Sequence, residues 1–207
     1  MKKQLLLIMI ITIIPMAISA QGQAGVKVLE GNVRYSLSNS EDFNLYYLQT
    51  NEYKNQHFNI NPKMGWFVSE SSVLGVGIGY SFSKYESESE YKEHLFSINP
   101  YFRNYQKITD KLFYTTTIDL AFGFGKESNE DYYTSNLFTY SLNTRPGLSY
   151  FLSDKWALKT NFGSLFYQRT NKKITEGVED KQPKLKDTDF GFNFSMDSFS
   201  LGIGYYF

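Results

Sequence analysis

Few residues in the chain could do covalent or metal chemistry. His57 and His94 are the only two histidines among 207 residues, and there is no cysteine. Without Cys, a disulfide framework, a thiolate zinc site and a Cys nucleophile are all excluded. Side-chain alternation in a strand places His57 with Asn59 on one face and His94 with Phe96 on the other. We therefore expect no metal site, no cofactor and no catalytic pair shared by the two histidines.

A lipid-modifying enzyme centred on His57 remains the least favoured alternative. The histidine would have to act as a base with a loop Ser as nucleophile and a carboxylate such as Glu52. No pattern of nucleophile, base and orienting group is visible in the sequence. The expectation is that the protein is not an enzyme.

Charged residues on the polar face of the expected strands are more informative. Asn143 is expected to face Asp119 across a hairpin, which puts Arg145 diagonal to Asp119. Buried charges are costly unless they are paired. The sequence therefore predicts a luminal polar network of Asp119 and Arg145, flanked by Lys63 and Arg103. A structural polar core is favoured over a narrow conduit lined by cationic groups.

The N-terminal residues 1–20 have the layout of a secretory signal peptide. Lys2 and Lys3 precede an apolar run over residues 5–14, and a small-residue exit ends at Ala20. The apolar run is shorter than the roughly 20 residues that a spanning helix needs. Cleavage is expected after Ala20, with an uncleaved membrane anchor as the alternative.

Residues 21–207 are expected to form one domain. Without the two N-terminal lysines, 19 basic residues stand against 21 acidic ones, so there is no basic footprint for nucleic acid. Apolar and polar residues alternate with a period of two, which indicates strands. The alternating segments are 29–37, 58–68, 74–82, 96–102, 112–124, 138–150, 156–166 and 190–207. The parity flips at Asp197-Ser198, which we interpret as a bulge inside an eighth strand rather than a turn before a ninth.

Three features favour a membrane barrel over a soluble barrel or sandwich. Long connections at about 38–56, 83–94, 125–136 and 168–188 alternate with short ones, as in outer-membrane barrels. Glycines lie on the polar face, where a narrow lumen would crowd larger side chains. Aromatic residues bracket the short turns and predict an interfacial girdle of Trp66, Tyr105, Tyr114, Tyr150, Trp156 and Tyr205. Phe190 and Phe192 are expected to extend the last strand, paired with residues 162–169 in a ribbon above the membrane.

The approach Pro62-Lys-Met-Gly-Trp-Phe-Val68 and the final Gly202-Ile-Gly-Tyr-Tyr-Phe207 resemble small Gram-negative outer-membrane β-barrel domains of the OmpA and OmpX type. The resemblance covers roughly residues 25–207 and implies outer-membrane insertion, with no single activity. Phe207, Tyr205 and Ile203 resemble the signal that the barrel-assembly machinery reads.

The sequence thus predicts an all-β fold: an eight-stranded antiparallel up-and-down transmembrane barrel preceded by a signal peptide. The expected location is the outer membrane, and the expected role is non-enzymatic, in envelope structure or in surface interaction through four long extracellular loops. Lysines and acidic residues of those loops suggest lipopolysaccharide or another surface as a partner. A barrel that transports a small or apolar solute by a lateral or luminal path is the alternative.

Overall fold

The computed structural model describes residues 24–44, 49–87, 89–129, 133–176, 184–194 and 199–207. The expected signal peptide and the Asp197-Ser198 bulge lie outside these residues. Within the described ranges, no helix has the length and apolar character needed to cross a membrane. The described chain is almost entirely strand, in keeping with its many Tyr, Phe, Thr and Ser residues.

The strands are β1 (Lys27–Asn44), β2 (Gln49–Phe67), β3 (Ser72–Glu86), β4 (Glu90–Lys107), β5 (Leu112–Asn129), β6 (Tyr133–Phe151), β7 (Trp156–Phe162), β8 (Ser164–Glu176), β9 (Lys184–Asn193) and β10 (Phe199–Tyr206). β9 pairs with β8, and β10 pairs with β7, so these four segments make two wall strands. The wall therefore has eight strands, as predicted.

The break between β7 and β8, which the alternation did not predict, lies at Gly163. This glycine has φ of 133°, a backbone conformation that L side chains rarely adopt. A Cβ atom there would also lie 2.7 Å from the backbone oxygen of Asn193. Glycine thus accommodates an irregularity within the seventh wall strand, whose neighbours stay the same: β7 and β8 both pair with β6. On the other side they pair with β10 and β9, the two parts of the eighth wall strand.

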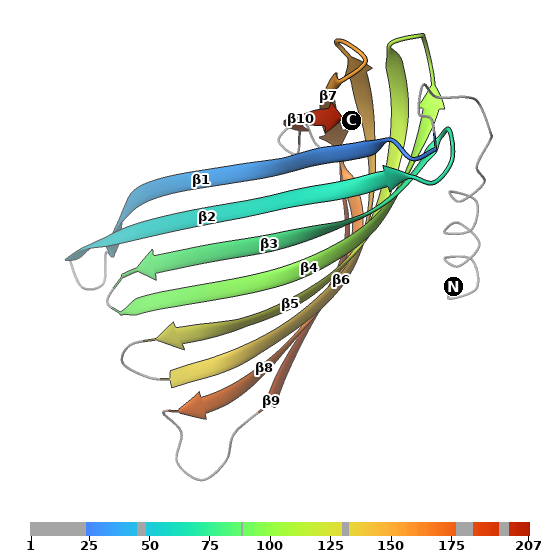
Figure 1. Cartoon of the computed structure of the whole chain (residues 1–207). Coiled ribbons are helices and arrows are strands. Elements are labelled where there is room, and N and C mark those ends of the chain that lie inside the picture. Colours follow the sequence, from blue (N-terminus) through green and yellow to red (C-terminus); the bar gives the residue numbers. More distant parts are fainter. Residues whose placement is uncertain (1–23, 45–48, 88, 130–132, 177–183, 195–198) are drawn as a thin grey trace, which may run out of the picture.

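Antiparallel pairing runs around the whole ring and closes the barrel at the rim of the short turns. Closure is made by β1 and β10, where Val28–Gly31 pair with Tyr206–Ile203. Beyond Gly31, no pairing joins β1 to β9 in the described ranges. Figure 1 shows the strands converging toward β7 and β10 and fanning out toward the opposite end, where β1 and β9 form the two margins.

Large apolar side chains face outward along the wall. Exposed members of this belt include Leu29, Val33, Leu74, Val76, Ile78, Phe96, Ile98, Leu120, Phe122, Phe124, Leu201 and Ile203. The opposite face of the same strands holds buried polar groups, including Asn99, Arg103, Thr117, Asp119 and Ser149. An apolar exterior around a polar interior is the arrangement of a membrane barrel and the reverse of a soluble one.

The expectation of four long loops was wrong, because most of those residues continue the strands. β1 and β2 pair from Asn44 and Gln49 inward, and β5 and β6 pair from Asn129 and Tyr133 inward. Beyond the apolar belt both faces of a strand meet water, so the sequence loses the contrast that reveals a strand. The predicted pairing of the last strand with residues 162–169 is confirmed, since Phe190 pairs with Tyr167.

Candidate functional site

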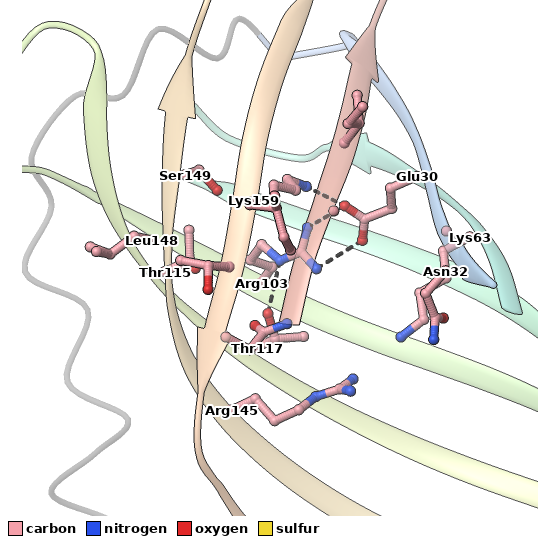
Figure 2. Close-up of a pocket in the computed structure, with 16 residues that line it drawn as sticks. Glu30, Asn32, Lys63, Arg103, Thr115, Thr117, Arg145, Leu148, Ser149 and Lys159 are labelled. Atoms are coloured by element: carbon pink, nitrogen blue, oxygen red, sulfur yellow. Dashed lines mark hydrogen bonds and ion pairs between the residues drawn. The ribbon is translucent and has the colours of Figure 1, made fainter. Parts of the chain in front are cut away.

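A buried ion cluster crosses the lumen near the short-turn rim. Glu30 on β1 accepts two hydrogen bonds from the Arg103 guanidinium on β4, at 2.7 and 2.8 Å. Lys159 on β7 forms an ion pair with the same carboxylate. The Nε–H of Arg103 donates to Thr117 Oγ1 at 2.8 Å, which ties the guanidinium to β5. Figure 2 shows these three charged groups meeting at one point.

The four predicted network residues fall into three environments. Arg145 Nη2 lies 2.6 Å from Asp119 Oδ2, and Asn143 is directly opposite Asp119 in the sheet. Arg103 belongs to the Glu30 cluster instead. Lys63 has no ion pair with any described residue, and its ammonium lies 5.6 Å from the centre of the Tyr101 ring.

Glu30 and Lys159 also belong to the network, although they were not among its predicted members. Both lie on the polar face of their strands, the one property in the sequence that points to them. Glu30 and Arg103 are on strands that do not pair with each other, so their contact crosses the lumen. Pairing between neighbouring strands does not bring these residues together, because their contact depends on how the barrel curves.

Beneath the ion cluster, five aromatic rings contact one another in a closed circle and fill the short-turn end of the lumen. Successive centroid distances are 5.5 Å for Phe67–Tyr105, 6.4 Å for Tyr105–Phe113, 5.3 Å for Phe113–Phe151, 4.9 Å for Phe151–Tyr206 and 6.2 Å for Tyr206–Phe67. These rings are all buried, and they share one apolar cluster with Val28, Val73 and Ala157. We call this set the aromatic plug.

The aromatic plug and the ion cluster are joined into one two-layer structure. The Tyr105 and Tyr206 hydroxyls are hydrogen bonded to each other at 3.1 Å. The Lys159 ammonium lies over both rings, 5.8 Å from the Tyr105 centroid and 5.4 Å from that of Tyr206. Charge and ring quadrupole attract in this geometry. The short-turn end of the barrel is therefore filled by side chains.

The predicted girdle is placed unequally. Trp66, Tyr150 and Trp156 are exposed on the outer wall, and Tyr114 and Tyr205 are partly exposed. Tyr105 was wrongly assigned to the girdle, because it is 1% exposed and belongs to the aromatic plug. It occupies an odd position of β4, like Arg103, and odd positions of this strand face the lumen. Of the three assembly-signal residues, Ile203 and Phe207 are exposed and Tyr205 is partly exposed.

The two histidines make separate contacts. His57 Nδ1 is hydrogen bonded to Ser83 Oγ at 3.0 Å, and His94 Nδ1 to the Tyr80 hydroxyl at 2.9 Å. No carboxylate is hydrogen bonded to His57 among the described side chains, which do not include that of Glu52. In the described part of the chain, no group of His, Asp and Glu is arranged to hold a metal ion.

A third polar cluster lies beyond the apolar belt, where β5 passes Phe124. Glu127 is 2% exposed; its Oε1 accepts a 2.8 Å hydrogen bond from the Tyr133 hydroxyl, and its Oε2 lies 2.9 Å from Lys172 Nζ. Burial by itself raises the pKa of Glu127, but the bonds from Lys172 and Tyr133 outweigh it and hold the pKa below its usual value. The cluster ties β5, β6 and β8 together.

Comparison with known proteins supports the fold. No protein-family model matches the chain, and no curated protein matches it. Among solved structures it is similar to the outer membrane protein OprG from Pseudomonas aeruginosa, with 13% identity and a TM-score of 0.51 over 91% of this chain and 99% of that one. It is also similar to the translocator domain of autotransporter NalP from Neisseria meningitidis, with 10% identity and a TM-score of 0.42 over 90% of each chain.

The likeness to OprG shows that the two proteins share a barrel fold. Together with the outward apolar belt and the enclosed polar face, it confirms the predicted integral outer-membrane barrel. What the barrel does is a separate question, since one fold supports many functions.

Proposed function

We propose that this protein is a non-enzymatic, non-conducting outer-membrane barrel that serves envelope structure or surface contact through its long outer rim. The observation that carries the proposal is the two-layer seal of the aromatic plug and the Glu30–Arg103–Lys159 cluster. A water-filled pore needs a continuous polar path, and a dry layer of packed rings interrupts it. Barrels of eight strands are narrow enough for side chains to fill.

The outer rim is the surface left for interaction. β5 and β6 remain paired out to Asn129 and Tyr133, and β8 and β9 form a ribbon with exposed Phe190 and Phe192. Lysines on this ribbon, such as Lys184, suit the phosphates of lipopolysaccharide. We propose outer-membrane lipids as the first partner, and the barrel-assembly machinery as the partner that reads the C-terminal Phe207.

Planar-bilayer recording tests the seal. The purified full-length protein should give no steady conductance in the nanosiemens range. The double variant Phe113→Ala/Phe151→Ala should show frequent openings, because it removes two adjacent rings of the aromatic plug. Ile108→Ala, in an exposed short turn, is the matched control and should stay silent. Steady large conductance from the unaltered protein would overturn the proposal.

A transport barrel is the second candidate. It is favoured by the margins of β1 and β9, which are not paired with each other in the ranges that the structure describes. Because the lumen is filled below, a solute that entered from the outer side would have to leave sideways between these strands. Unpaired backbone groups in lipid are costly, so such a gap would need an occupant or a closing motion. Cells lacking the protein would then take up an apolar solute more slowly while their lipid composition stayed unchanged.

The non-enzymatic part of the proposal has its own test. Membrane lipids from cells that carry His57→Ala should match those of cells with the unaltered protein, and both should match those of cells without it. A lipid species that appears only with the unaltered protein would support the enzyme alternative instead.

A further inference from the structure

The charged lumen contains a pocket of about 140 Å³ above the ion cluster. Five ionisable residues line it, namely Glu30, Lys63, Arg103, Arg145 and Lys159, and several hydroxyl and amide groups lie between them. A water molecule takes up roughly 30 Å³ of liquid, so the space corresponds to a few waters or one small oxyanion. Gly202 forms part of the lining, and a Cβ atom there would meet nothing within 4 Å, so this glycine leaves part of the room.

The charges around the pocket do not balance. Four cationic groups (Lys63, Arg103, Arg145 and Lys159) face two carboxylates, Glu30 and Asp119, which leaves an excess of two positive charges. Glu30 is shared by two of the cations, and Asp119 is engaged by Arg145. An uncompensated charge within a protein wall surrounded by lipid is costly. A bound anion would offset that cost.

Several polar groups at the pocket lack hydrogen-bond partners among the described residues, the Thr160 hydroxyl among them. The Nε–H of Arg145 is buried and has no hydrogen-bond partner among the described residues, although Nη2 of the same side chain binds Asp119. Within the described part of the chain, the Lys63 ammonium makes no ion pair and lies 5.6 Å from the centre of the Tyr101 ring. Figure 2 shows the Arg145 guanidinium set apart from the Glu30 cluster, with no interaction drawn to the other residues of the pocket.

We propose that this pocket binds a small oxyanion, a phosphate or sulfate group, with Lys63 and Arg145 as its direct ligands. Ammonium and guanidinium groups make strong, charge-assisted hydrogen bonds to such oxygens. The Glu30–Arg103–Lys159 cluster forms the floor of the pocket and contributes its excess positive charge. This inference goes beyond the proposed function: a sealed barrel can bind the anion or lack it, and conductance does not report on binding.

The experiment is a thermal-unfolding titration of the full-length protein in a neutral detergent. Inorganic phosphate is compared with chloride at matched ionic strength, so that general screening cancels. Phosphate should raise the unfolding temperature along a saturable curve, because a ligand that binds only the folded state stabilises it. Lys63→Gln should weaken the apparent affinity about tenfold or more, as the loss of a charged hydrogen bond predicts. Lys111→Gln, in an exposed turn, is the matched control and should leave the curve unchanged.

A second variant and a second phosphate source separate the outcomes. Arg145→Lys keeps a cation beside Asp119 but removes the Nε–H, so it should weaken phosphate binding. This variant tests the site independently if Lys63→Gln does not fold. In the other arm, free phosphate is replaced by vesicles of a neutral lipid to which a lipid with an exposed phosphate headgroup has been added. Stabilisation in that arm alone would identify the anion as a lipid headgroup. Equal effects of phosphate and chloride, or equal responses of Lys63→Gln and Lys111→Gln, would overturn the proposal.

Discussion

Glu30 and Arg103 are 73 positions apart and meet through two hydrogen bonds inside the barrel. Glu30 lies on β1, the strand that closes the wall, and Arg103 lies on β4. Lys159 brings β7 to the same carboxylate. One acidic side chain therefore connects three parts of the wall across the lumen, at the level where β1 and β10 complete the ring.

Replacing Glu30 should destabilise the barrel strongly. Glu30→Gln leaves two buried cations without a carboxylate, and breaking one partner of a buried pair costs about 3–5 kcal/mol. The free energy of unfolding is measured by urea titration of the protein refolded in detergent. Glu70→Gln, in an exposed short turn, should change it by less than about 0.5 kcal/mol. Equal stability of the two variants would show that the ion cluster contributes nothing to the free energy of unfolding.

The aromatic plug should contribute through packing. Phe113 is fully buried between Tyr105 and Phe151, and truncating a buried Phe to Ala costs about 3–5 kcal/mol. We expect Phe113→Ala to lower the free energy of unfolding by that amount, which a lower urea midpoint would report. The exposed Phe122 supplies the comparison, since Phe122→Ala removes the same atoms from the lipid-facing wall. If Phe122→Ala lowered the free energy of unfolding more than Phe113→Ala does, the rings of the aromatic plug would not be tightly packed.

Gly65 should tolerate no side chain. A Cβ atom there would lie 2.5 Å from the Tyr101 hydroxyl and 2.6 Å from Val73 Cγ1. Overpacking of this kind costs about 1–3 kcal/mol, so Gly65→Ala should unfold at lower urea concentration. At Gly202 a Cβ atom would meet nothing within 4 Å, which makes Gly202→Ala the control. Adding Tyr101→Phe to Gly65→Ala should restore part of the lost stability. If it restores none, the destabilising clash is not with the Tyr101 hydroxyl.

Acid should weaken the outer rim through Glu127. Because the folded-state pKa of Glu127 is depressed, its stabilising effect is complete above the ordinary pKa of 4.5 and is lost as pH falls through the folded value. Burial lowers the pKa of Lys172, but its bond with Glu127 outweighs this and raises it, so the lysine's contribution is lost only at alkaline pH. The contribution of this pair to the unfolding temperature should be constant between about pH 6 and 9 and should be lost below about pH 4.

A variant isolates the Glu127 contribution from that of other carboxylates. Glu127→Gln removes the titrating group but keeps an acceptor for the Tyr133 hydroxyl. Its unfolding temperature should decline less steeply in acid than that of the unaltered protein. Parallel curves for the two proteins would mean that acid acts through other groups.

Alternation along the chain determined much of the fold. A period of two, with Phe, Leu and Ile on one face, required strands, and the polar opposite face with its glycines indicated an enclosed lumen. Burial of Tyr101 against Gly65 and Gly75 shows what those glycines accommodate. Local pairing rules also placed Asn143 opposite Asp119, with Arg145 nearby.

Other features depended on curvature, which no local pattern contains. The Glu30–Arg103 contact and the circle of five rings form only when distant strands face one another across a narrow lumen, so Tyr105 could be mistaken for a wall residue. The extent of the strands beyond the membrane was also hidden, because water on both faces removes the apolar contrast. The sequence by itself determined which side of each strand meets lipid, since hydrophobicity is a property of each residue. The tertiary structure alone decided which enclosed charges meet, because those distances are set by barrel closure.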